Sequence, residues 1–381
     1  MSLRRPCSRA STMHKRVEGA LQCAAGIAMT GAPVLTDARV AVLIVTYKVA
    51  ALTIDCLRSL ASEREANGLS LRAYVVDNAS GDAPAILSAI NEFGWSGWVR
   101  LIESPVNRGY AYGNNLALAF AREEAPPDFA FLLNPDTTVR GGAVSTLLNF
   151  FAEHPRAGIV GSALEGRSGN LWPYAFRFPS VWSEIDNGLQ FGLVARLLAR
   201  KVVLRRMGDT PERVDWLPGA SMMISRPVLE AIGGLDQSYF LYYEETDYFL
   251  RAHRAGFETW YVPQARVMHI AGQSTGVTGV KKVPARRPAY WFESRRRYFL
   301  LNHGSAYAII TDVAAMCAHA LGAVKRVFLG RRNLGVPNYL ADLWHHSTLH
   351  PSNRRLAPRL CKCTEGEVCA AKACSKTLAE T

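Results

Sequence analysis

The chain lacks the features that would place it among membrane-spanning or repeat proteins. No run of 18 uninterrupted apolar residues is present, and a spanning helix needs about that length. No internal repeat is visible, which argues against a solenoid. Its 49% hydrophobic and 20% charged residues are typical of a globular protein rather than a disordered one. With 381 residues, it is long enough to bury one large core or two smaller ones.

The cysteines lack the pattern of a disulfide scaffold or a zinc site. The chain has eight, which is few for its length. Cys56 and Cys317 lie in apolar patterns, so we predict that both are buried thiols. Four others lie in CKCTEGEVCAAKAC (361–374), without the paired CxxC spacing of structural zinc. We therefore expect an irregular, partly disordered tail.

The chain has fewer acidic than basic residues, which gives it a formal net charge of +12. A basic balance favours polyanionic partners: nucleic acid, anionic lipid or phosphorylated small molecules. The basic residues cluster at the start of the chain, around residues 281–297 and after residue 325. These clusters lie outside the predicted core, and no zinc-finger or RNP-like motif is present, so we expect no nucleic-acid partner.

Both ends of the chain differ from its middle. Residues 1–38 are basic and rich in Ala and Gly, and we expect a disordered extension, although residues 19–35 loosely resemble a signal sequence. Residues 306–329 are apolar with a basic end, a pattern typical of a helix that lies on a membrane surface or packs on the core. We expect residues 305–381 to form this amphipathic helix and a basic, cysteine-containing tail.

Strand-like apolar runs alternate with helical segments in the first half of the chain. The predicted strands cover residues 38–47, 71–82, 97–105, 128–138 and 157–162. The alternation predicts an α/β fold with a doubly wound, mostly parallel sheet and helices on both faces. Beyond it, residues 166–215 are predicted to form an insertion or lid, and residues 257–274 two short strands.

Polar residues follow each of the first four predicted strands. Because the carboxyl ends of parallel strands meet at one edge of a sheet, these residues should gather there. Each alone is an ordinary loop residue, and Asn-Pro-Asp alone is a turn signal, but four such endings in succession favour a ligand site. The residues are Thr46, Tyr47, Asp77, Asn78, Asn107, Arg108, Gly109, Asn134 and Asp136.

A nucleotide would use these groups. Asp77 could accept a hydrogen bond from a base or a ribose hydroxyl, and Asn78 and Thr46 could add polar contacts. The planar guanidinium of Arg108 is suited to a diphosphate. Asp136 could hold Mg²⁺ or Mn²⁺, which would also touch the diphosphate.

Six motifs, in order, carry a resemblance to a known family. They are LIVTYK, YVVDNASGD, NRGYAYGNN, FLLNPDT, WLPGAS and GGLDQSYFLYYEETDYFLRAHRAG. The chain resembles the inverting glycosyltransferases of family 2, which have the GT-A fold, and it is most similar to their rhamnosyltransferase-like branch. The resemblance covers about residues 40–304. It implies a GT-A domain over residues 39–304, with a nucleotide-binding half (39–162) and an acceptor and catalytic half (163–304).

The resemblance implies an activity and a setting. A sugar, with rhamnose as a candidate, would move from a nucleoside diphosphate donor to a hydroxyl of a saccharide or a lipid-linked acceptor, with inversion. The process would be cell-surface polysaccharide synthesis. The enzyme would be cytoplasmic or peripheral at the inner face of the cell membrane, with an anionic membrane surface as a partner.

The resemblance also assigns roles to the metal and nucleotide residues. Asp77 resembles the residue that holds the base. Asp136 resembles the last carboxylate of an Asp-x-Asp metal motif, in which Asn134 replaces the first. His269 resembles a histidine that completes the metal shell, although a buried structural histidine is the alternative. The implied cofactor is a divalent metal, Mg²⁺ or Mn²⁺.

The catalytic base is expected in the segment LYYEETDYFLR. Glu245 occupies the base position of the family, and Glu244 is the alternative. Asp247 is expected to order the start of a helix or to pair with Arg251. Three acids at a helix N-terminus could also serve the helix dipole alone.

Other residues are assigned to the acceptor side or to anions. Trp216, Gly219 and Ala220 are expected to line the acceptor cleft, with a core role as the alternative for the tryptophan. The basic run of residues 295–297 is expected to contact diphosphate or anionic lipid, or to form a solvated helix face.

Three other functions stay open at this point. A nucleotidyltransferase has a similar sheet, but VTYKVAAL lacks the glycine-rich loop typical of that class. A basic nucleic-acid-binding protein would explain the charge. An inactive glycosyltransferase homologue would explain the departures from the family at Lys48, Asn134 and Glu245.

Overall fold

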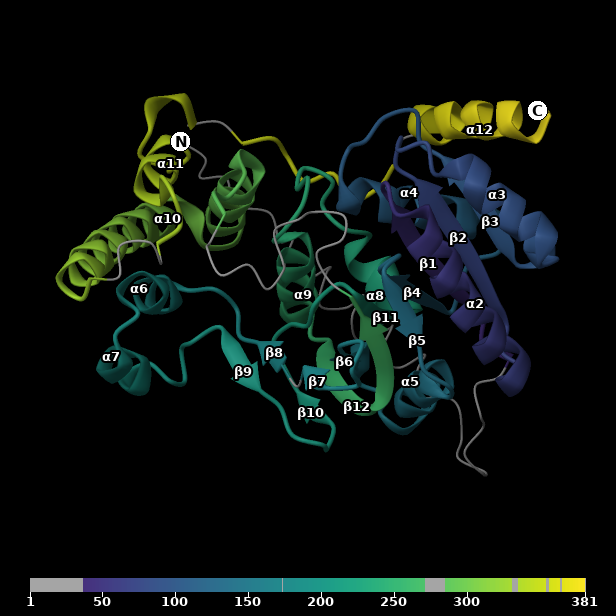
Figure 1. Cartoon of the computed structure of the whole chain (residues 1–381), viewed down its shortest axis with the longest axis horizontal. Helices are drawn as coiled ribbons and strands as arrows, with labels where there is room; N and C mark the ends of the chain where they lie inside the picture. Colours follow the sequence, from purple (N-terminus) through teal and green to yellow (C-terminus); the bar gives the residue numbers. More distant parts are fainter. Residues whose placement is uncertain are drawn as a thin grey trace, which may run out of the picture.

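The computed structural model describes residues 37–172, 174–270, 285–330, 335–353, 356–363 and 365–380. The extension predicted for residues 1–38 lies almost wholly outside this part of the chain. Figure 1 shows a sheet with helices packed around it, and helices α10 and α11 extending to one side.

The sheet begins with four parallel strands. β1 (Val40–Thr46) lies between β2 (Leu71–Asp77) and β4 (Phe129–Leu133), and β3 (Val99–Glu103) pairs with β2. β1 and β4 are buried along their whole length, as expected of strands covered on both faces. Their carboxyl ends meet at the edge where the polar residues follow them.

The second half of the sheet is mixed. β11 (Ser221–Ser225) runs antiparallel between β4 and β6 (Ala157–Glu165), and β12 (Glu258–His269) pairs parallel with β6. The short strands β5 (Thr137–Val139), β7 (Leu171–Trp172) and β10 (Glu212–Arg213) pair antiparallel with β12, β6 and β12 respectively. The mostly parallel sheet is confirmed.

Helices cover both faces of the sheet, as predicted. One buried apolar cluster joins the sheet to α2 (Ala50–Asn67), α3 (Ala83–Glu92) and α5 (Ala143–Glu153). A second joins its other face to α4 (Tyr110–Glu124), α8 (Arg226–Ile232) and α9 (Glu244–Arg254). A short 3₁₀ turn, η2 (Trp95–Gly97), precedes β3.

The region predicted to be an insertion contains regular elements. β8 (Tyr174–Phe176) and β9 (Leu204–Arg206) form a two-stranded sheet. Along the chain, α6 (Val181–Leu189) and α7 (Gly192–Leu197) lie between these two strands. Residues 257–274 were expected to hold two short strands. Within the described residues this was wrong, because β12 runs unbroken to His269, and its pairing with β6 is interrupted only by register shifts between Glu258 and Thr259 and between Val262 and Arg266.

α10 (Ala289–Phe328) is two helices joined at Gly304, where φ is 83°. The part after Gly304 packs against α6 so closely that a Cβ on Gly322 would lie 2.1 Å from the Gly188 carbonyl oxygen. By length and composition α10 could cross a membrane, although a third of its most apolar window is buried. This stretch is not an uninterrupted apolar run, because Asp312 lies within it.

The basic run of residues 295–297 does not form a solvated face. Arg295 is buried and pairs with Glu184 at 2.7 Å and Asp312 at 2.5 Å. Arg297 is buried and pairs with Asp236 at 2.7 Å. The expectation that these two arginines contact diphosphate or lipid is therefore wrong, because internal carboxylates already neutralise them.

The C-terminal segment is more ordered than predicted. α11 (Tyr339–His345) and the 3₁₀ turn η4 (Pro351–Asn353) follow α10. α12 (Glu365–Glu380) returns to the first half of the sheet and packs on β3 and α4. Cys56 is buried as predicted, but Cys317 is exposed, because it lies on the side of α10 that faces away from α6.

Candidate active site

A cavity of about 560 Å³ opens at the carboxyl ends of β1, β2 and β4, beside the start of α9. Eleven of the residues predicted from the sequence line it: Tyr47, Asn78, Asn107, Gly109, Asn134, Asp136, Gly219, Ala220, Glu244, Glu245 and His269. Residues from both predicted halves therefore meet at one cavity.

Thr46 and Asp77 are buried and do not line the cavity. Thr46 donates a hydrogen bond to Asp82 (Oγ1–Oδ2 2.8 Å). Asp77 accepts from the backbone N–H groups of Ser80 (2.9 Å) and Ala83 (3.0 Å). Both of its carboxylate oxygens therefore hold the turn before α3, and base recognition by Asp77 stays a prediction.

Arg108 does not line the cavity. Its guanidinium pairs with Glu367 of α12 and lies 4.6 Å from the ring of Tyr112. The geometry therefore does not bring Arg108 to the residues that would surround a diphosphate. The pairing with Glu367 was not visible in the sequence, because 259 residues separate the partners.

Only part of the WLPGAS segment lines the cavity. Trp216 stacks on Phe176 with ring centroids 4.4 Å apart and donates its indole N–H to the Arg177 carbonyl at 2.9 Å. It therefore packs beside β8, outside the cavity. Gly219 and Ala220 line the cavity, and Tyr110 donates its hydroxyl to the Gly219 carbonyl at 2.9 Å.

Asp136 and His269 face one another although they are 133 residues apart. Asp136 Oδ1 lies 3.2 Å from His269 Nε2, and Asn134 Nδ2 lies 3.4 Å from the same nitrogen. The antiparallel pairing of β5 with β12 places Thr137 opposite His269 and so brings the two side chains together. This arrangement depends on a strand pairing that local sequence does not specify.

The donor set of this pair fits a divalent metal that is shared with a substrate. A carboxylate oxygen and an imidazole nitrogen are suitable ligands for Mn²⁺. Two protein ligands leave the remaining positions to phosphate oxygens and water, which is usual where a metal is bound through substrate phosphates. No cluster of three or more His, Cys, Asp or Glu suited to a metal occurs in the described part of the chain.

Glu244 and Glu245 form the first turn of α9 at the cavity wall. Burial and the neighbouring Glu245 raise the pKa of Glu244 well above its ordinary value, and burial raises the pKa of Glu245. On each carboxyl group, Oε2 is buried without a hydrogen-bond partner among the described residues. Such an oxygen can accept a proton or a hydrogen bond from a bound hydroxyl.

The backbone before the two glutamates is strained. Tyr242 and Tyr243 both have positive φ, at 68° and 67°. This conformation is uncommon for non-glycine residues and clusters at functional sites. The two residues turn the chain sharply so that α9 starts at the cavity.

Aromatic and apolar side chains complete the wall, and sequence analysis missed most of them. They are Val45, Tyr110, Pro135, Pro218, Phe240, Leu241, Tyr242 and Tyr290. Tyr290 stacks with Tyr242 at 6.2 Å although it comes from the start of α10. The run FLYYEE next to the expected base was the one local signal for this wall.

Gly109 joins the two halves of the site. Its φ is 90°, and a Cβ there would lie 2.0 Å from the Phe240 carbonyl oxygen. That carbonyl accepts the backbone N–H of Tyr110 at 3.0 Å. Asn78 adds a bond to the Gly109 carbonyl at 3.2 Å. Only glycine allows this close approach between the strand ends and the loop before α9.

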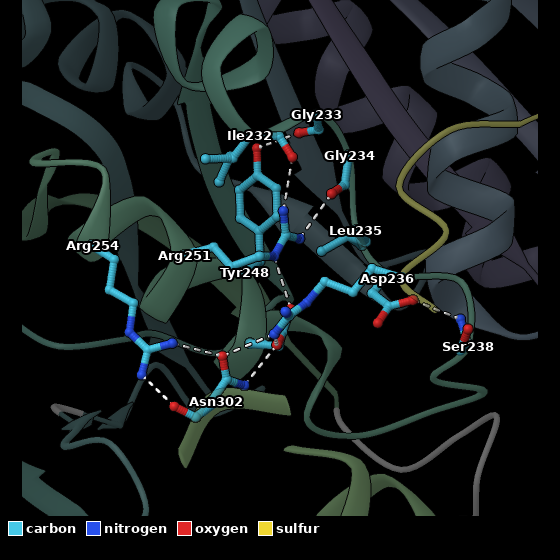
Figure 2. A network of polar contacts seen from close by, with 12 residues as sticks. Ile232, Gly233, Gly234, Leu235, Asp236, Ser238, Tyr248, Arg251, Arg254 and Asn302 are labelled. Carbon is cyan, nitrogen blue, oxygen red and sulfur yellow. Dashed lines mark hydrogen bonds and ion pairs between the residues drawn. The ribbon is translucent and has the colours of Figure 1, made fainter. Parts of the chain in front are cut away.

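A polar network holds α9 from behind (Figure 2). Arg251 donates to Asp247 (2.8 Å) and to the carbonyls of Ile232 (2.8 Å) and Gly234 (2.9 Å). Asn302 of α10 donates to the other oxygen of Asp247 at 2.8 Å and accepts from Arg254. The predicted pairing of Asp247 with Arg251 is therefore confirmed.

This arrangement is that of α/β enzymes that bind a nucleotide where parallel strands end. The chain matches the family described as "Glycosyltransferase like family 2" over residues 38–298. That match covers more than half of its length, so the chain belongs to this family, and it is an enzyme of the glycosyltransferase class.

Curated relatives with a stated activity are similar to this chain at moderate identity. One is the N-acetylglucosaminyl-diphospho-decaprenol L-rhamnosyltransferase of Mycobacterium tuberculosis, 29% identical over 226 residues, which are 56% of this chain and 67% of that protein. Another is rhamnosyltransferase WbbL of Escherichia coli, 26% identical over 166 residues, which are 43% of this chain and 61% of that protein. These relatives support the rhamnosyltransferase-like branch.

A solved structure supports the fold. The chain is similar to GalNAc-T7, solved with UDP, GalNAc and Mn²⁺, with a TM-score of 0.51 and 13% identity. The match covers 82% of this chain and 58% of that one. The predicted GT-A fold is confirmed.

Proposed function

We propose that this glycosyltransferase moves a sugar, rhamnose as the first candidate, from a nucleoside diphosphate to a hydroxyl of a saccharide carried by a lipid. The observation that carries the proposal is that Glu244, Glu245, Asp136 and His269 all line one cavity. A base and a metal-binding pair are the two chemical parts that such a transfer needs. The names of the M. tuberculosis and E. coli relatives support rhamnose, and the name of the M. tuberculosis relative also supports a lipid-linked acceptor.

The nucleotide end of the donor would lie along Tyr47, Asn78 and Asn107. Asn78 already donates to Asn107 Oδ1 at 2.9 Å, which orients both amides at the cavity wall. Phe240, Leu241 and Pro218 supply apolar surface, which suits a sugar that carries a methyl group. Asp136 and His269 would hold a divalent metal, which would stabilise the charge of the departing diphosphate.

Glu245 would act as the general base. The acceptor oxygen attacks the anomeric carbon while its proton passes to a carboxylate oxygen of Glu245. The bond from that carbon to the diphosphate oxygen breaks, and the diphosphate leaves with the electron pair. Attack opposite the leaving group inverts the anomeric centre. Burial and the neighbouring Glu245 raise the pKa of Glu244, so Glu244 would carry a proton and orient Glu245.

A panel of sugar nucleotides, with and without Mn²⁺ or Mg²⁺, tests the proposal by thermal stabilisation and slow donor hydrolysis. A ligand at a hundred times its Kd adds about 2.7 kcal/mol to the free energy of unfolding. We expect stabilisation by one donor, strengthened by metal and lost in Asp136→Ala and His269→Ala. Donor binding without any transfer to lipid-linked acceptors would favour an inactive homologue instead.

A further inference from the structure

The second part of α10 carries a continuous apolar stripe that the protein leaves uncovered. Ile310, Val313, Cys317, Leu321, Val324 and Phe328 are all exposed and recur every three or four residues. This spacing places them on one side of the helix over about five turns. Phe328 is 86% exposed, so even the largest of these side chains has little contact with the protein.

The opposite side of the same helix is buried. Ala308, Asp312, Ala315, Ala318 and Gly322 have almost no exposed surface, because α6 packs against this part of α10. The helix is therefore held in place by one side while its stripe faces away from the sheet. Apolar patches of this kind mark interaction surfaces rather than ordinary surface residues.

A second apolar and basic segment lies beside the end of this helix. Lys325 of α10 donates to the Leu189 carbonyl at 2.8 Å and lies 5.5 Å from the Phe191 ring. Just beyond, Leu197 of α7 is 78% exposed. Figure 1 shows α7 and the end of α10 on the same side of the molecule, away from the sheet.

The charged residues within the two segments that form this surface are all basic. Residues 187–208 and 313–330 together contain seven basic residues and no acidic one. Arg196, Arg200 and Lys201 of the first segment are exposed. A second copy of this chain would bring like charges together, whereas an anionic bilayer would neutralise them. An apolar stripe flanked by Lys and Arg is the pattern of helices that lie in a membrane interface.

We infer that the exposed faces of α7 and of α10 after Gly304 form one docking surface for an anionic phospholipid membrane, with α10 lying flat in the interface. This inference deepens the proposed function, since a lipid-linked acceptor would reach the cavity from that membrane. The first part of α10, before Gly304, contributes Tyr290 to the cavity wall, so the membrane surface follows the active site directly along the chain.

Flotation of the full chain with phosphatidylcholine vesicles, with and without phosphatidylglycerol, tests the inference. We expect binding only to the anionic vesicles, weakened at high salt. Replacing Arg196, Arg200 and Lys201 by Gln should weaken it about a hundredfold, since each basic residue near the surface contributes about fivefold. Leu321→Gln with Phe328→Gln should weaken it at least about tenfold at every salt concentration.

Matched variants outside the surface control for charge and exposure. Arg39, Arg156 and Arg167 are exposed, and replacing them by Gln should leave binding nearly unchanged. Phe93→Gln is the control for the stripe, since Phe93 is 39% exposed on the nucleotide-binding half. Equal binding by surface and control variants, or no binding to anionic vesicles, would overturn the inference, as would self-association through the stripe measured by sedimentation.

Donor stabilisation and slow donor hydrolysis, measured without vesicles, separate this inference from the proposed function. We expect the surface variants to lose vesicle binding but to keep donor stabilisation and donor hydrolysis. If the wild-type protein hydrolyses the donor but does not bind anionic vesicles, the inferred membrane surface is wrong while the proposed function stands.

Discussion

Arg359 Nη2 lies 2.8 Å from Asp247 Oδ1, so a residue near the end of the chain pairs with a buried carboxylate two positions after Glu245. Arg359 lies beyond the family match, which ends at residue 298. Residues 356–363, which contain Arg359, are called the C-terminal strap. This strap also bonds to the loop before α9: the Leu360 N–H donates to Asp236 Oδ1 at 3.1 Å, and the Leu360 carbonyl accepts the backbone N–H of Gln237 at 2.8 Å. The C-terminal strap therefore supports α9, the helix that begins with Glu244 and Glu245.

Arg359→Ala should destabilise the protein by about 1–3 kcal/mol, because it removes a charged partner from a buried carboxylate. Burial by itself would raise the pKa of Asp247, but Arg251 and Arg359 hold it below its ordinary value of 3.8. The stability from this lowered pKa is present above pH 3.8 and is lost as the pH falls through the folded-state pKa. Thermal unfolding should therefore show a smaller difference between wild type and variant at the acid end.

Arg39→Ala is the control for Arg359→Ala. The pair of Arg39 with Asp128 is 3.5 Å long and exposed on both sides, so its loss should cost under about 1 kcal/mol. Arg359→Lys should restore part of the stability. Equal effects of the Arg39 and Arg359 variants would contradict a supporting role for the strap.

Glu245→Gln should lower kcat by about 10²–10⁴-fold while donor binding persists, because a general base acts in the chemical step. Burial raises the pKa of Glu245 above 4.5, and a base works only when deprotonated. The acid limb of kcat/KM should therefore lie above pH 4.5 and vanish in the variant. Glu65→Gln, an exposed change on α2, should keep the wild-type profile. Near-normal turnover in Glu245→Gln would exclude the assignment.

Glu244→Gln should stabilise the folded protein at neutral and alkaline pH. Because the folded-state pKa of Glu244 is raised, the folded protein binds more protons than the unfolded chain from pH 4.5 upward, and stability falls as pH rises through this window. The neutral amide removes that penalty, by about 1.4 kcal/mol for each unit by which the pKa is raised. Tm measured at several pH values should show a gain that grows with pH, and a gain independent of pH would count against this explanation.

Gly109→Ala should separate the loop before α9 from the strand ends, since its Cβ would lie 2.0 Å from the Phe240 carbonyl oxygen. We expect a loss of stability of more than about 1–2 kcal/mol and loss of donor stabilisation. Gly68→Ala is the control: its φ is also positive, at 58°, but nothing lies within 4 Å of the added Cβ. It should cost about 1 kcal/mol and leave donor binding intact.

Lys48→Asn should stabilise the protein modestly. Lys48 has φ of 59°, a left-handed conformation that asparagine tolerates better than lysine. A gain of about 0.5–1 kcal/mol in chemical denaturation would agree with this strain. Lys201→Asn, an exposed change elsewhere, should give no such gain.

The sequence by itself determined the α/β architecture and most of the cavity wall. Continuous apolar runs of strand length and Asn, Asp and Gly at their ends are local signals, and parallel strands bring those ends to one edge. Asn78, Asn107, Asp136 and Gly219 are placed at the cavity for that reason. The order of the six motifs also indicated the family, and the family match over residues 38–298 agrees with it.

Only the tertiary structure decided where long side chains point and which distant segments meet. Arg108 and Trp216 lie within the expected motifs, but their side chains contact Glu367 and Phe176, which are outside those motifs. Arg295 is basic in sequence, yet buried carboxylates from α6 and α10 neutralise it. The raised pKa values of the two glutamates, the Arg359 strap and the uncovered stripe of α10 likewise depend on packing between segments far apart in the chain. Local periodicity and turn chemistry do not specify such contacts.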